Sequence, residues 1–156
     1  MRSKRSMRRR VLSWISLAGA AAVATPASAS PFCDQLRTIG AAASGGFASY
    51  RGEPRAMTAT WLKYRATRTL PGASSCEIDS INEDFTCRWE LASKGEAKRR
   101  QADFVREVAS CLPGSPPTRL LKGEVGFFVG SARQPGAYAV KIWSIRSTAI
   151  VIVDHY

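Results

Sequence analysis

Histidine is scarce in this sequence, and its scarcity removes several catalytic chemistries. The only histidine is His155. A Ser–His or Cys–His nucleophile needs a histidine as its base, and no Gly-x-Ser-x-Gly elbow occurs. Neither Gly-x-x-x-x-Gly-Lys nor Gly-x-Gly-x-x-Gly is present, so no phosphate or dinucleotide loop is expected. We therefore predict no catalytic residue and no cofactor.

Cysteine pairs at the spacing of metal ligands are also missing. No Cys-x2-Cys pair occurs, which argues against a zinc knuckle and a thioredoxin-like redox role. The acids Glu77, Asp79, Glu83 and Asp84 crowd one predicted hairpin tip, but that tip lacks the glycine on which calcium loops turn. We expect a solvated tip and no metal site. An enzyme that works with these carboxylates alone remains the third hypothesis.

The sequence has one long apolar run, residues 11–23, and its 13 residues fall short of the roughly 20 that span a bilayer. A basic segment with six Lys and Arg precedes it, and Ala27-Ser28-Ala29 follows. These three parts predict a signal peptide over residues 1–29, cleaved after Ala29, and a periplasmic or secreted protein. An amphipathic membrane anchor is the alternative, and Arg8-Arg9-Arg10 leaves a twin-arginine export route open.

The predicted leader accounts for most of the net charge. Six of the 23 Lys and Arg and none of the 12 Asp and Glu lie in it, so +11 becomes +5. A mildly basic surface of this kind gives no reason to expect nucleic acid as a partner. The remaining 127 residues, 30–156, suit a single domain, and they contain no further apolar segment long enough to be transmembrane.

Four cysteines follow the leader, and an even number in an exported chain predicts two disulfides. Residues Ser75–Asp79 and 85–91 alternate as two strands do. A hairpin with loop 80–83 sets Ile78 opposite Phe85, and the same register sets Cys76 opposite Cys87. We therefore predict a Cys76–Cys87 bridge at a non-hydrogen-bonded position, which leaves Cys33 to pair with Cys111. Pairing of Cys33 with a hairpin cysteine is the alternative.

Periodicity and turn residues predict an α+β fold. Ser30-Pro31 begins a helix that Gly45-Gly46 ends, and a second amphipathic helix covers residues 94–112. A loop at 50–54 leads into the first of about six strands, which lie at 58–67, 75–79, 85–91, 120–129, 138–145 and 149–153. The order is α-βββ-α-βββ, with an antiparallel sheet and both helices on one face.

The first predicted strand offers a candidate binding surface. If Leu62 and Tyr64 face the core, Trp61, Lys63 and Arg65 face outward, and Trp and Arg are enriched where binding energy concentrates. The alternative is that Trp61 packs under loop 49–55 and the cations are simply solvated. Further candidate cations are Arg68, Lys98, Arg99 and Arg100.

The leading hypothesis is a non-enzymatic binding protein of the cell envelope, such as an inhibitor, an immunity-type protein or an assembly factor. Its partner would be another envelope protein. The alternative hypothesis is a protein that binds anionic envelope components, such as lipopolysaccharide, glycan or lipid headgroups, through its basic surface. Salt separates the two, because contacts between exposed charges weaken as ionic strength rises.

Overall fold

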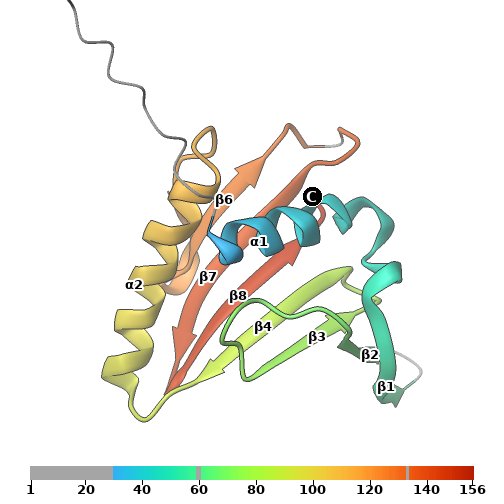
Figure 1. Cartoon of the computed structure of the whole chain (residues 1–156), viewed down its shortest axis with the longest axis horizontal. Coiled ribbons are helices and arrows are strands. Elements are labelled where there is room, and N and C mark those ends of the chain that lie inside the picture. The colour runs from blue at the N-terminus through green and yellow to red at the C-terminus, as the bar shows by residue number, and fades with distance from the viewer. Residues whose placement is uncertain (1–29, 59–60, 133) are drawn as a thin grey trace, which may run out of the picture.

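The computed structural model describes residues 30–58, 61–132 and 134–156, so the predicted signal peptide lies outside the described residues. Eight antiparallel strands form one sheet in the order β1-β2-β3-β4-β8-β7-β6-β5 (Figure 1). The elements are α1 (Pro31–Ala41), β1 (Arg51–Thr58), β2 (Trp61–Ala66), β3 (Ser75–Asp79), β4 (Asp84–Glu90), α2 (Lys94–Cys111), β5 (Thr118–Arg119), β6 (Val125–Val129), β7 (Tyr138–Ile145) and β8 (Thr148–Asp154). Three short 3-10 turns are η1 (Ala43–Gly45), η2 (Ala48–Tyr50) and η3 (Leu121–Gly123).

The chain runs through the same succession of elements twice. Each half is one α-helix followed by four strands, and the halves join where β4 pairs with β8 along residues 84–90 and 148–154. Both α-helices lie on the same face of the sheet (Figure 1). Helix α2 contacts β6, β7 and β8, while α1 contacts α2, β7 and β8. The predicted α+β class and the single helical face are therefore confirmed.

Side-chain caps begin both helices where the sequence predicts a helix start. The Ser30 hydroxyl accepts from the Cys33 backbone N–H, and Pro31 occupies the first helical position. At α2, the Ser93 hydroxyl accepts from Glu96 N–H, and the Glu96 carboxylate accepts from Ala92 N–H. Such reciprocal capping satisfies backbone donors that have no partner within the helix.

The two disulfides form as the hairpin register predicts. Ile78 pairs with Phe85 and Cys76 with Cys87 across β3 and β4. The Cα atoms of Cys76 and Cys87 are 4.2 Å apart, which fits the close spacing of a non-hydrogen-bonded pair. Cys33 and Cys111 form the second bridge and join α1 to α2. Two disulfides are compatible with an oxidising compartment.

The predicted count of about six strands is wrong, because the structure has eight. The two additional strands, β1 and β5, lie at the edges of the sheet and lack the alternation of apolar and polar residues from which the other strands were predicted. The sequence predicts a loop at 50–54, yet Arg51–Thr58 forms β1. Its register with β2 shifts on both sides of Pro54, as in a bulged edge strand. The predicted strand over 120–129 is also shorter than expected. It begins only at Val125, because Lys122 and Gly123 have φ of 59° and 80° and turn the chain through η3.

The hydrophobic core lies between the sheet and the segments that cover one of its faces. On the β6–β8 half, α1 and α2 supply the cover, with Phe32 stacked on Phe104 at 5.6 Å between ring centroids. On the β3–β4 half, the loop before β3 and the buried Phe47 take over that role; Phe47 lies 5.7 Å from the Phe85 ring. Within the described residues, no helix is both long and apolar enough to cross a membrane.

Candidate functional site

The predicted cations on β2 point away from the helices. Lys63 pairs in register with Asp79 and Arg65 with Glu77, whereas Tyr64 pairs with the buried Ile78 on the core side. This alternation places Lys63 and Arg65 on the sheet face that neither helix covers. The side chain of Trp61 lies outside the described part of the chain, so its predicted exposure stays a prediction.

The remaining predicted cations lie elsewhere. Lys98 and Arg99 are exposed on α2, and the Arg100 guanidinium lies 4.0 Å from the centroid of the Phe104 ring. The Arg68 guanidinium lies over Tyr50 at 5.3 Å. Since α2 covers one face of the sheet and β2 directs its cations to the other, the candidate cations do not form one continuous basic surface.

Two of the hairpin acids, Glu77 and Asp79, form hydrogen bonds with neighbouring groups. Glu77 accepts from the Arg88 guanidinium at 2.8 Å. Asp79 is buried, and its Oδ1 accepts from the backbone N–H groups of Ile81 and Asn82 at 3.0 and 3.1 Å, which fixes the turn after β3. Among the described residues, no group of three His, Cys, Asp or Glu side chains is placed to hold a metal ion.

Three aspartates share one row across the uncovered sheet face. Asp79 pairs in register with Asp84, which pairs with Asp154 on β8. Burial raises the pKa of Asp84, and the negative charges of Asp79 and Asp154 raise it further, against a lowering by the Thr86 hydroxyl and by the positive charge of Lys63. Burial also acts to raise the pKa of Asp79, but hydrogen bonds from Asn82 and Ile81 outweigh it and leave that pKa lowered. The pKa values of these two neighbouring carboxyls are therefore shifted in opposite directions.

An Asp84→Asn variant is expected to be more stable than the natural protein at neutral pH, by about 0.5 kcal/mol. The folded pKa of Asp84 is raised, so ionisation costs the folded state stability as pH rises through that pKa. An amide avoids this cost and can still accept from the Thr86 hydroxyl through its Oδ1. Urea denaturation at pH 7 and near pH 3 measures the effect, which should vanish at the lower pH.

Asp79→Asn is the matched control, because the folded pKa of Asp79 is lowered and its charge contributes stability above the unfolded pKa. This control should be less stable than the natural protein at pH 7, and the difference should shrink as pH falls through the folded pKa. An Asp84→Asn variant no more stable than the natural protein at pH 7 would contradict the raised pKa of Asp84.

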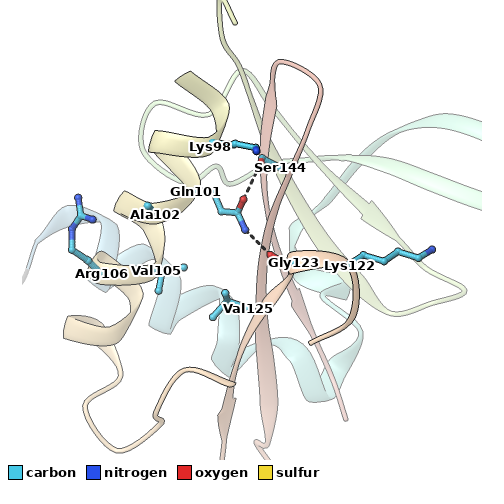
Figure 2. A pocket seen from close by; sticks show the side chains of 9 residues that line it. All are labelled: Lys98, Gln101, Ala102, Val105, Arg106, Lys122, Gly123, Val125 and Ser144. Carbon is cyan, nitrogen blue, oxygen red and sulfur yellow. Dashed lines mark hydrogen bonds between the residues drawn. The ribbon is translucent and has the colours of Figure 1, made fainter. Parts of the chain in front are cut away.

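A groove of about 680 Å³ opens between α2 and the segment from η3 to β6. Figure 2 shows Gln101 spanning it, with the amide Nε2 donating to the Gly123 carbonyl at 2.9 Å and the Ser144 hydroxyl donating to Oε1 at 2.8 Å. The other lining residues are Lys98, Ala102, Val105, Arg106, Lys122 and Val125. Gln101 thus ties α2 to η3 and to β7.

The groove has an apolar floor and a positive rim. Ala102, Val105 and Val125 supply apolar surface, and no carboxylate is among its lining residues. Arg106 is paired with Asp103, whereas Lys98 and Lys122 form no ion pair within the described residues and supply the positive charge of the rim. Figure 2 shows Arg106 and Lys122 extending outward on opposite sides. Leu121, next to the groove on η3, is 85% exposed.

Comparison with protein-family models, curated proteins and solved structures finds no match for this chain. Its function is therefore argued from its own residues.

Sequence reasoning identified Lys98 but missed the other groove residues. Lys122 and Val125 fall in the segment that the sequence predicts as one continuous strand. The signal that could have separated them is Lys122-Gly123, because glycine often marks a break in a strand. Nothing in the sequence indicates that this turn lies against Gln101 and Val105 of α2.

Proposed function

We propose that this protein is a non-enzymatic binding protein of the periplasm or the extracellular space, and that its partner is another protein of the cell envelope. The observation that carries the proposal is the groove between α2 and β6. Its apolar floor and lysine rim suit a partner segment that presents apolar side chains beside Asp or Glu.

The rigidity of the groove walls supports this proposal. Helix α2 is bridged to α1 through Cys111 and to the sheet through Gln101. The Arg37 guanidinium adds two hydrogen bonds to the Cys111 carbonyl, at 2.8 and 3.2 Å. A surface held in place before binding loses less conformational entropy when its partner docks, so more of the contact energy appears as affinity.

Charge reversal at the rim tests the proposal. Lys98→Glu/Lys122→Glu is expected to weaken binding of a protein captured from envelope extract by at least about tenfold, or about 1.4 kcal/mol. The physical reason is repulsion between the new carboxylates and the acidic partner segment. Affinity is measured on the purified pair, and melting curves verify that the variant is folded.

The matched control is Arg99→Glu, which changes an exposed cation on the same helix but outside the groove. A photo-crosslinker at Ala102, inside the groove, should trap the partner, whereas one at the exposed Ser110 should not. Equal loss of affinity in the control, or equal trapping at Ser110, would show that the groove is not the docking site.

A second candidate function is the binding of anionic envelope components, such as lipopolysaccharide or glycan, by basic residues. One observation favours it: Arg65 and a second arginine, Arg55, line the same small pocket where β1, β2 and the start of β3 meet. Binding of this kind should weaken between low and physiological ionic strength, because exposed charge contacts are screened.

A further inference from the structure

A pocket of about 290 Å³ lies where β1, β2 and the start of β3 meet. Its lining residues come from the edge strand β1, from its neighbour β2, from the loop that joins β2 to β3 and from the start of β3. The lining residues are Arg55, Arg65, Ala66, Thr69, Ser74, Ser75 and Cys76. The pocket is therefore lined by two arginines and three hydroxyl-bearing residues, and no acidic residue is among its lining residues.

A bulge in β1 directs Arg55 to this pocket. Pro54 pairs with Tyr64 and Ala56 with Lys63, so Arg55 is the extra residue that has no partner in the register. A bulge re-aims the side chain of its extra residue and commonly does so beside functional sites. The regular part of β2 supplies Arg65 from the opposite strand.

The positive charge of the pocket is not neutralised within the described residues, where neither Arg55 nor Arg65 forms an ion pair. Glu77 pairs in register with Arg65, but its carboxylate is bonded to Arg88 at 2.8 Å. Two like charges held at one site repel each other unless an anion lies between them. The arrangement therefore favours a bound anion.

The hydroxyl groups define what kind of anion fits. The Ser74 Oγ accepts from the Glu90 backbone N–H at 3.0 Å, which leaves its hydroxyl proton available to donate. Ser75 and Thr69 add two more hydroxyls at the same pocket. Guanidinium forks bind phosphate oxygens in pairs, and hydroxyl groups can donate to the remaining oxygens.

We infer that this pocket binds a phosphoryl group, held by Arg55 and Arg65 with help from Ser74 and Ser75. The pocket volume exceeds that of a phosphate group alone, so it leaves room for part of the molecule that carries the phosphate. The inference deepens the second candidate function and is independent of the groove at α2, with which the pocket shares no lining residue.

Calorimetry with inorganic phosphate tests the site in the processed, oxidised protein. The natural protein is expected to bind phosphate, and Arg55→Gln/Arg65→Gln to bind it at least tenfold more weakly. Arg65→Lys should lose part of the affinity, because an ammonium group keeps the charge but lacks the fork. The control Arg99→Gln, an exposed cation on α2, should bind as the natural protein does.

Two results would overturn the inference: no phosphate binding by the natural protein, or an equal loss in Arg99→Gln. Vesicles of phosphatidylcholine containing phosphatidic acid distinguish the source of the phosphate. Binding to these vesicles that Arg55→Gln/Arg65→Gln abolishes assigns a lipid headgroup, whereas phosphate binding without vesicle binding assigns a free or soluble phosphate. Crosslinking at Ala102 reports on the groove separately, so either proposal can fail while the other stands.

Discussion

A Cys33→Ala/Cys111→Ala variant is expected to lose about 4.5 kcal/mol of the free energy of unfolding. The bridge spans 78 residues, and a long loop closed in the unfolded chain removes more of its conformational entropy than a short one. Both cysteines are buried in the core, so their replacement also removes packing between α1 and α2. Urea denaturation of the natural and variant proteins measures the difference.

The hairpin disulfide supplies the matched control. Cys76–Cys87 spans only 11 residues, so Cys76→Ala/Cys87→Ala is expected to lose about 3 kcal/mol. Backbone pairing holds β3 and β4 together even without their disulfide, whereas no backbone pairing of this kind joins α1 to α2. A larger loss from the hairpin variant than from the interhelical one would contradict this account.

Gly40→Ala is expected to destabilise the protein by about 2 kcal/mol, although alanine forms helices better than glycine. Gly40 is buried in α1 directly against the ring of Tyr138 on β7. A Cβ atom on residue 40 would lie 2.5 Å from Cε2 and 2.8 Å from Cε1 of that ring, well inside van der Waals contact. Helix and strand would have to separate, which disturbs a close-packed core.

A double-variant cycle tests the cause. Tyr138→Leu removes the ring, so Gly40→Ala should cost less in a Tyr138→Leu background than in the natural protein. Denaturation of the four proteins gives the coupling between the two positions. If Gly40→Ala raises the denaturant midpoint of unfolding, the helix preference of alanine outweighs the clash with Tyr138, and the predicted destabilisation is wrong.

The regular centre of the fold could be predicted because its signals are local or repeat with a fixed period. Ser30-Pro31 and Ser93 with Glu96 satisfy backbone donors that every helix start exposes, so they mark both helices. Strict alternation in β3 and β4 allows one register only, and that register brings Cys76 to Cys87. The edge strands of the sheet have neither a helix-capping residue nor strict alternation to mark them. Strand β1 is bulged around Pro54, and β5 has only two residues.

The candidate sites could be predicted only in part. The outward alternation of β2 indicated Lys63 and Arg65, and the amphipathic pattern of α2 indicated Lys98. Arg55 and Lys122 were missed because a bulge and a left-handed turn place them. Both irregularities bring together residues that are far apart in the sequence.

The sequence by itself determined the α+β class, the two helix starts, and the hairpin register with its Cys76–Cys87 pair, since these depend on hydrogen-bonding demands or side-chain periods along the chain. The Cys33–Cys111 pair followed only by elimination. Only the tertiary structure decided the number of strands and the groove and pocket that result. Those features depend on which distant segments pack together, as Gly40 with Tyr138 and Gln101 with Gly123 show. Packing of this kind leaves no periodic trace in the sequence.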